Sequence, residues 1–301
     1  MKIDVMSEAL RRIEEIRADR VHGASYLSRR ALEVLKLVIE KGSGTKEDFL
    51  EGLKNVGGRL IKVRPGMAPI ANLVAHLVYG VFQLSKEKEL ELLRNLAYSK
   101  AEELERSSKL VLKKAAACGV QIIEDNDKIM TCSYSSTIKE VFRMAHRGEK
   151  NVRVWVLESK YKDKSYGRMM ADELCRERIF PHVVPDVAIK DYITQVRKVL
   201  VGADSILRDG GLINGLPTYE LALAAKGKIP FYVVCERLKF NPQVSSTQVK
   251  LEAGFDLTPP ELITEIITEA GTFKPEDVAL HMKELERYFG VFRTLFKDDH
   301  Y

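Results

Sequence analysis

The chain has 301 residues, which is long enough for two domains or for one large domain with a helical extension. A hydrophobic content of 45% and a charged content of 30% exclude an intrinsically disordered chain and indicate a well-cored globular protein. The net charge of +5 is mild for this length, so we expect no direct nucleic-acid partner, whereas a phosphorylated small ligand is compatible with it.

The cysteines and the apolar stretches indicate a cytoplasmic protein. Four cysteines are scattered along the chain without a CxxC pair, which argues against a zinc site and a disulfide framework. The N-terminus is charged from its second residue, unlike a signal peptide, and the longest apolar stretch, 71–84, is too short to span a bilayer. We therefore expect no membrane contact, no metal site and no cofactor.

The first third of the chain is predicted to be helical almost throughout. Apolar residues recur at helical spacing over 10–16 and 32–39, and a single long helix is expected over about 86–117. The loop 41–45 ends the second of these helices, and Thr45 is the expected N-cap of the next one.

The pattern changes close to Gly119, after which strands alternate with helices. Short β-branched runs predict strands at 128–132, 152–157, 182–184, 199–202 and 231–234. Helical stretches are expected between and after them at 136–146, 168–178, 189–196 and 220–226. This alternation predicts an α/β fold with a mainly parallel sheet: a helical N-terminal domain over 1–118 and a Rossmann-like domain over 119–301.

The segment that follows the strand at 199–202 is the first candidate site. It places the carboxylate of Asp204 at the carboxyl end of a strand, where ligands bind in open α/β sheets. Asp209-Gly210-Gly211 and Asn214-Gly215 are typical of turns, so we expect a loop there whose backbone N–H groups line a phosphate site. The alternative for Asp204 is a cap or a turn residue.

A hydroxyl-rich loop over 131–137 follows the first predicted strand. The N-terminus of the helix that comes after it is a natural anion site, and Ser133, Ser135 and Ser136 add hydrogen-bond donors there. The alternative is ordinary helix capping by Ser135 or Ser136. Its place at the first strand-to-helix turn of the sheet favours ligand binding.

Two unusual loops in the helical domain are a third candidate. One contains His22-Gly23-Ala24, and the other contains Arg64 followed by Pro65-Gly66. Inter-helix turns would explain both loops. The functional interpretation is that Arg64 reaches into a cleft between the domains and holds a phosphate, for which a guanidinium is well suited.

Four segments resemble the family that joins the alpha, beta and delta regulatory subunits of translation initiation factor 2B with aldose-phosphate isomerases. They are VGADSILRDGGLINGLPTYELALAAK, IPFYVVCERLKF, FDLTPPELITEIITEAG and RPGMAPIANLV. The isomerases act on methylthioribose 1-phosphate and ribose 1,5-bisphosphate. The resemblance implies a helical domain, then a Rossmann-like domain that carries the interface of a homodimer or hexamer.

The departures from the isomerase pattern concern the catalytic positions. Isomerases carry Thr-His-Cys-Asn at the first strand-to-helix turn, where the Cys and the Asp of Gly-Ala-Asp form the catalytic pair. Here Ser133 stands in the place of that cysteine and Cys132 replaces the histidine. The phosphate-binding lysine of Asn-Lys-Ile-Gly-Thr is replaced by Gly215, and His22 stands where isomerases carry arginine.

The resemblance leaves two main hypotheses, beside a nucleotide-binding regulator of another kind on the same fold. In the first, the protein is a non-catalytic homologue close to the archaeal factor 2B-like branch, which binds a nucleotide or sugar phosphate and the alpha subunit of initiation factor 2. In the second, it isomerises ribose 1,5-bisphosphate or a related aldose 1-phosphate with Cys132 and Asp204. Neighbouring residues that leave a strand point to opposite faces. The second hypothesis therefore requires a one-residue shift at the end of the first strand, such as a bulge, that turns the Cys132 side chain into the pocket.

Overall fold

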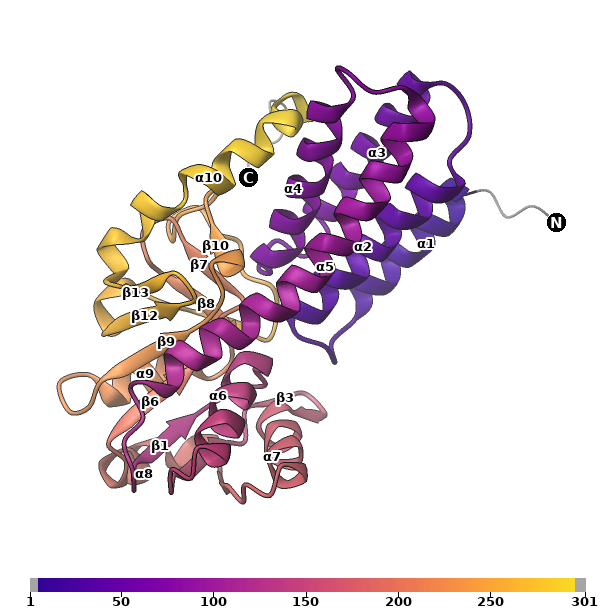
Figure 1. The fold of residues 1–301 in the computed structure, drawn as a ribbon. Helices are drawn as coiled ribbons and strands as arrows, with labels where there is room; N and C mark the ends of the chain where they lie inside the picture. Colours follow the sequence, from indigo (N-terminus) through magenta and orange to yellow (C-terminus); the bar gives the residue numbers. More distant parts are fainter. Residues whose placement is uncertain (1–4, 296–301) are drawn as a thin grey trace. The chain divides into compact units, whose positions relative to one another are not determined.

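The computed structural model describes residues 5–295, which fall into two compact units (Figure 1). The first unit combines the part of the chain up to Lys109 with the segment that begins at Met282, and the second runs from Leu110 to His281. The domain boundary expected at 118/119 falls inside the long helix α5 (Leu90–Val120), and it stays a prediction.

The first unit is helical, as the sequence predicted. Its elements are α1 (Val5–Ala18), α2 (Ala24–Lys41), α3 (Lys46–Ile61), α4 (Ala68–Leu84), most of α5, α10 (Lys283–Tyr288) and the 3-10 helix η6 (Phe289–Leu295). Thr45 is the N-cap of α3: its hydroxyl accepts the N–H of Asp48, and the Asp48 carboxylate accepts the N–H of Thr45. Apolar faces of these helices meet in a common core in which side chains such as Leu35, Leu53 and Val74 are fully buried.

The second unit is built on a seven-stranded sheet with the order β13-β12-β9-β6-β1-β2-β5. The strands are β1 (Lys128–Thr131), β2 (Arg153–Leu157), β5 (His182–Val184), β6 (Lys198–Val201), β9 (Phe231–Val234), β12 (Glu265–Thr268) and β13 (Gly271–Phe273). All neighbours are parallel except β12 and β13. This confirms the Rossmann-like expectation, including all five predicted strands.

Helices and short turns connect these strands. They are α6 (Ser136–Arg147), α7 (Tyr166–Arg176), η1 (Asp186–Ala188), α8 (Ile189–Tyr192), η2 (Ile193–Gln195), α9 (Thr218–Ala225), η3 (Arg237–Lys239), η4 (Pro260–Leu262) and η5 (Pro275–His281). Buried strand residues such as Ile129 and Val156 pack with Phe142 of α6 and Leu174 of α7 in one apolar core. The helix expected over 189–196 is shorter than predicted, because only its first four residues are α-helical.

A second sheet holds the segment that the sequence assigned to turns. Its strands, in the order β10-β7-β8-β11, are β10 (Phe240–Asn241), β7 (Ser205–Leu207), β8 (Leu212–Gly215) and β11 (Phe255–Thr258), and a hairpin joins β3 (Lys160–Tyr161) to β4 (Lys164–Ser165). Gly210, with a φ of 84°, lies in the predicted turn between β7 and β8. The turn expected at Asn214-Gly215 is wrong, because these residues end β8 and pair with Asp256 and Phe255 of β11.

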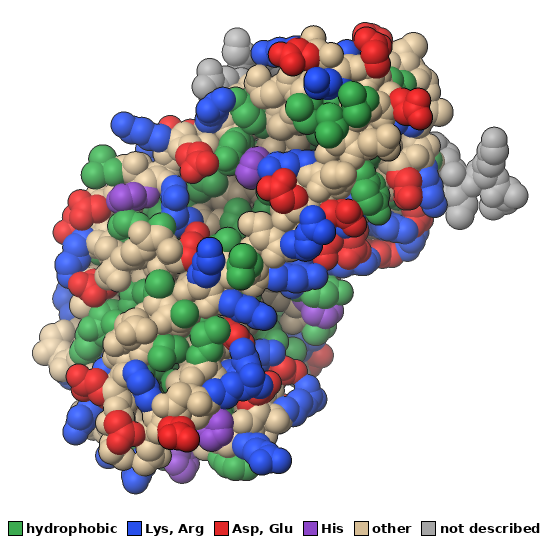
Figure 2. Space-filling view, in the orientation of Figure 1, with side chains coloured by type: hydrophobic (Ala, Val, Ile, Leu, Met, Phe, Trp, Pro, Cys, Tyr) green, Lys and Arg blue, Asp and Glu red, His purple; other side chains and the backbone are tan. Residues whose placement is uncertain are grey.

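The surface of the protein carries charges of both signs. Lys and Arg side chains are interspersed with Asp and Glu over the face shown in Figure 2. Within residues 5–295, no helix is long and apolar enough to cross a membrane, and no three His, Cys, Asp or Glu side chains gather as a metal site would need.

Candidate functional site

The strand order places a topological switch point at the carboxyl ends of β1 and β6. From β1 the chain proceeds outward through β2 to β5, and it then returns to the other side of β1 with β6 and continues through β9 to β12. The order therefore reverses between β1 and β6, and in open α/β sheets ligands bind at this switch point. Cys132 and Ser133 follow β1, and Asp204 is the third residue after β6.

Cys132 is buried beside Thr218, and burial keeps its thiol neutral. Its sulfur lies 3.2 Å from the hydroxyl of Thr218, and this hydroxyl donates to the carbonyl of Gly215 at 2.7 Å and accepts the Asn214 amide at 3.0 Å. A hydroxyl has one proton to donate, so the contact with Cys132 requires the thiol to be the donor. Burial raises the pKa of the Cys132 thiol far above its ordinary value, which agrees with this assignment.

Ser133 departs from the extended backbone of β1. Its φ of 60° lies in the left-handed region, and its N–H donates to the hydroxyl of Ser159 at 2.7 Å. Its own hydroxyl lies over Gly215, since a Cβ built on Gly215 would stand 2.3 Å from the Ser133 Oγ. The two positions at which the sequence departs from the isomerase pattern, Ser133 and Gly215, are therefore in direct contact.

Ser135 has the capping role that the sequence left open. Its hydroxyl accepts the N–H of Ile138 at 3.2 Å and so caps α6, which begins at Ser136. The same side chain packs on Gly202 at the end of β6, where an added Cβ would stand 2.2 Å from the Ser135 Oγ. The first turn of α6 carries no acidic residue, so the positive end of this helix faces no carboxylate of its own.

Asp204 lies half-buried on the short connection between β6 and β7. Its N–H donates to the carbonyl of Ile213 at 2.9 Å, which ties the connection to β8, the strand that ends with Asn214 and Gly215. The hydrogen-bond partner of the Cys132 sulfur is Thr218 and not Asp204. The Cys132 sulfur thus forms no hydrogen bond with Asp204, and a catalytic role of the two residues stays a prediction.

Two further residues belong to this end of the unit and were missed from the sequence. Asp256 pairs with Asn214 across β11 and β8, and one of its oxygens accepts the N–H of Tyr219 at 2.9 Å at the start of α9. Burial raises the pKa of the Asp256 carboxyl from 3.8 to about 7. The signal in the sequence that could have identified Asp256 was its position within FDLTPP, the start of one of the segments that carry the family resemblance.

The second missed residue is Lys239, which follows the carboxyl end of β9. The residue is only 5% exposed, and its ammonium, which is not fully buried, forms no hydrogen bond or ion pair with another described residue. A buried cation is costly unless an anion accompanies it, so this lysine is a candidate anchor for an anionic ligand. The signal in the sequence was the motif CERLKF.

The structure also brings together the four candidate residues of the helical unit. Asp19 accepts the backbone N–H of His22 and contacts its ring Nδ1 at 2.8 Å, while buried Arg64 donates to the carbonyl of Asp19 at 2.7 Å. Gly23 precedes α2 without a side-chain cap, and Ala24 is the first residue of that helix. A binding role for these four residues stays a prediction.

Comparison with known proteins places this geometry in a family. The model of the initiation factor 2 subunit family matches residues 20–254. A Pyrococcus abyssi protein provisionally named a translation initiation factor eIF-2B subunit 2-like protein is 34% identical over 88% of this chain and 96% of its own length. A ribose 1,5-bisphosphate isomerase of Thermococcus kodakarensis is 30% identical over 90% of this chain and 92% of its own length.

A solved structure shows the same fold. It is the tetrameric eIF2B-beta2-delta2 complex from C. thermophilum, of which one chain matches with a TM-score of 0.81 and 19% identity over 94% of this chain and 96% of that one. Both the factor 2B-like proteins and the isomerases thus match along nearly the whole chain. The protein belongs to the initiation factor 2 subunit family.

Proposed function

We propose that this protein is a factor 2B-like regulatory protein that binds a phosphorylated small molecule and does not convert it. The observation that carries the proposal is the state of Cys132, whose buried thiol donates to Thr218 while a serine occupies the position of the isomerase cysteine. A serine hydroxyl does not exchange a proton near neutral pH without a base, and a thiol held as a donor is not a base either.

Retained ligand binding is supported by the groups around the switch point. Lys239 is a lysine that is only 5% exposed, the first turn of α6 offers the backbone N–H groups that Ser135 does not cap, and the Asn214 amide lies at the end of β8. Arg64, His22, Gly23 and Ala24 remain the candidate ligand-binding residues of the helical unit. We include Ser133, Ser135, Ser136 and Gly215 as residues that border the ligand.

A thermal-shift screen tests ligand binding. The wild-type chain is heated with ribose 1,5-bisphosphate, other sugar phosphates and nucleotides, and at least one of them is expected to raise the melting temperature by mass action. Lys239→Gln is expected to lose most of that rise, whereas Lys226→Gln, which changes an exposed lysine of the same unit, keeps it. A screen in which no compound stabilises the wild type contradicts the proposal.

The isomerase hypothesis is the second candidate, because relatives of that name match at 30% identity over 90% of the chain and Asp204 is present. It requires the Cys132 side chain to leave Thr218 when substrate binds. If the enzyme is active, turnover of ribose 1,5-bisphosphate should vanish both in Cys132→Ser and in Asp204→Asn. Absence of turnover by the wild type removes this candidate.

The proposed assembly is a homodimer or a hexamer that contacts the alpha subunit of initiation factor 2. Related chains form oligomers, among them the tetrameric complex described above. Sedimentation equilibrium should give the mass of two or six chains, and a monomer contradicts the proposal. Titration of the purified alpha subunit into the protein by calorimetry tests the partner, and absence of heat over buffer counts against it.

A further inference from the structure

The hairpin of β3 and β4 is attached to the turn that follows β1, within the second unit. At its root, the buried hydroxyl of Ser159 accepts the N–H of Ser133 at 2.7 Å. The carboxylate of Asp186 accepts the N–H groups of Ser159 and of the next residue at 2.7 and 2.9 Å. The hydroxyl of Ser165 donates to the carbonyl of Glu158 at 2.7 Å, which closes the two ends of the hairpin on each other. The hairpin therefore has a fixed place beside Ser133.

Three residues of this region have a left-handed backbone although none of them is glycine. The φ angles are 60° at Ser133, 50° at Ser159 and 53° at Lys162, which lies in the turn between β3 and β4. Residues with a Cβ adopt this conformation rarely, and where they do, the surrounding structure imposes it. The path of the chain from the turn after β1 to the tip of the hairpin is thus determined by its contacts.

Tyr161 connects the tip of the hairpin to the strands β8 and β11. Three atoms of its ring lie 3.2–3.5 Å from the Cβ position of Gly254, so the ring packs directly on this glycine. The carbonyl of Gly254 accepts the N–H of Leu216 at 3.1 Å and lies 4.0 Å from the Cβ position of Gly215. Because the Ser133 hydroxyl also lies over Gly215, only Gly254 separates the Tyr161 ring from the candidate site.

Lys162 is the cation that this arrangement brings to the site. Its ammonium lies 5.5 Å from the centre of the Tyr161 ring, on the residue that packs on Gly254. Lys162 is exposed, and its ammonium forms no hydrogen bond or ion pair with any residue that the structure describes, the adjacent Asp163 included. Lys160 is exposed too, but it neighbours Tyr161 in β3, and neighbours in a strand point to opposite faces.

We propose that Lys162 binds a phosphate group of the ligand beside Ser133 and Gly215. This role rests on the proposed function, because it concerns the same phosphorylated ligand. A lysine ammonium is a compact charge with three donors on a flexible stem, so it can turn from the Tyr161 ring to an anion bound next to it. The glycines at 215 and 254 allow the Ser133 hydroxyl and the Tyr161 ring to approach the backbone closely, which sets the place of this contact.

Calorimetric titration of the full-length chain with ribose 1,5-bisphosphate tests the proposal. Lys162→Gln should raise the dissociation constant at least about threefold, because it removes one charge from the phosphate contact. Lys160→Gln is the matched control: it changes the same residue type on the other face of the hairpin and should stay within about twofold of the wild type. Both lysines are exposed, so melting temperatures without ligand should equal that of the wild type.

Chemical modification of the wild type gives a second measurement that needs no variant. Lysines are acetylated with an N-hydroxysuccinimide ester, with and without ribose 1,5-bisphosphate, and the modified peptides are quantified by mass spectrometry. The ligand should slow the acetylation of Lys162 and leave that of the exposed Lys160 and Lys226 unchanged.

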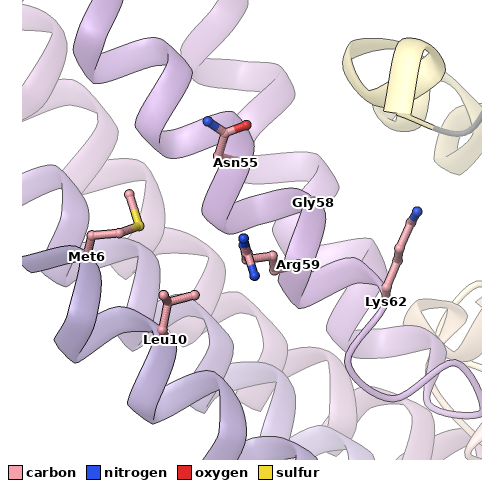
Figure 3. Close-up of a pocket in the computed structure, with 6 residues that line it drawn as sticks. All are labelled: Met6, Leu10, Asn55, Gly58, Arg59 and Lys62. Atoms are coloured by element: carbon pink, nitrogen blue, oxygen red, sulfur yellow. The ribbon is translucent and has the colours of Figure 1, made fainter.

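A control in the helical unit excludes general charge attraction. The exposed Arg59 side chain projects into the space between α1 and α3 (Figure 3), and Arg59→Gln should leave the affinity within about twofold. If the wild type binds the ligand but Lys162→Gln binds equally well, or Lys160→Gln or Arg59→Gln weakens binding as much, the role of Lys162 is overturned and the proposed function stands. Unchanged acetylation of Lys162 has the same meaning. If the wild type itself does not bind, both are overturned.

Discussion

At the scale of single residues, the chemistry of the candidate site depends on the contacts of the two residues that follow β1. The alternation of side chains along a strand predicts that Cys132 and Ser133 point to opposite faces. In the structure Ser133 leaves the extended conformation, and Cys132 contacts Thr218 while Ser133 lies against Gly215. The sequence did not reveal the partners, because Thr218 follows 86 positions after Cys132 and the contact arises only when α9 packs near the end of β1. The Ser133–Gly215 contact was hidden for the same reason.

The thiol of Cys132 should be unreactive in the folded protein. Thiolates and not thiols are the nucleophiles, and this thiol is buried with a raised pKa. Alkylation with iodoacetamide at mildly alkaline pH, followed by peptide mass spectrometry, should label the exposed Cys175 at least about a hundredfold faster than Cys132. Equal labelling rates in the native state would show an activated or accessible Cys132.

The contact of Gly202 with Ser135 should be intolerant of a side chain. In Gly202→Ala the new methyl would stand 2.2 Å from the Ser135 Oγ and 2.7 Å from its Cβ, and rotation of the hydroxyl relieves only the first contact. We expect a loss of about 1–3 kcal/mol of unfolding free energy in urea denaturation.

Gly80→Ala is the matched control for this substitution. Apart from the neighbouring backbone of α4 itself, no atom lies within 4 Å of the Cβ position at Gly80, so alanine should raise the unfolding free energy by up to about 1 kcal/mol. Equal effects of the two substitutions would contradict the packing described at Gly202.

At the scale of elements, periodicity identified the strands and helices of the parallel sheet and missed the second sheet. The strands of the parallel sheet are apolar runs separated by amphipathic helices, which sequence patterns reveal well. The strands β7, β8 and β11 are only three or four residues long and lie between glycines and prolines, so they were interpreted as turns or left unassigned. Asn214-Gly215 has the composition of a turn, but its pairing with β11 decides its conformation.

The link between β11 and α9 should make stability depend on pH through Asp256. Its pKa rises from 3.8 in the unfolded chain to about 7 in the folded protein, chiefly through burial, so the folded state binds the proton more tightly. The stability that this group contributes is therefore complete below about pH 4 and is lost as the pH rises to about 7.

Asp256→Asn isolates this dependence, because the amide resembles the protonated carboxyl and still accepts the N–H of Tyr219. Melting temperatures of the variant and the wild type are compared between about pH 4 and pH 8. The melting temperature of the variant should rise relative to that of the wild type as the pH rises. If the difference in melting temperature stays constant, or if the wild type becomes the more stable protein as the pH rises, the pKa of the Asp256 carboxyl is not raised.

At the scale of the whole molecule, the end of the chain belongs to the helical unit. Phe292 is fully buried and lies against Gly57 of α3, and Arg287 donates to the hydroxyl of Tyr79 on α4 at 2.6 Å. Composition changes along a sequence mark where one kind of structure gives way to another. They do not show that a C-terminal segment packs with the first helices, since that depends on contacts between distant positions.

Removal of the Phe292 ring should destabilise the helical unit selectively. Phe292→Ala deletes a fully buried aromatic ring, which typically costs about 3–5 kcal/mol. Hydrogen exchange measured by mass spectrometry should show faster exchange in α3 and α4, with β1 and β6 unchanged. Uniformly faster exchange in both units would contradict the assignment of this segment to the helical unit.

The central claim is that the site at the switch point binds a phosphorylated ligand without converting it. The most direct test is NMR spectroscopy of ribose 1,5-bisphosphate labelled with ¹³C at C1, mixed with a stoichiometric amount of the wild-type chain. We expect the C1 signal to broaden or shift on binding and to keep its intensity over hours. Replacement of that signal by one from a ketose product would contradict the claim and establish the isomerase.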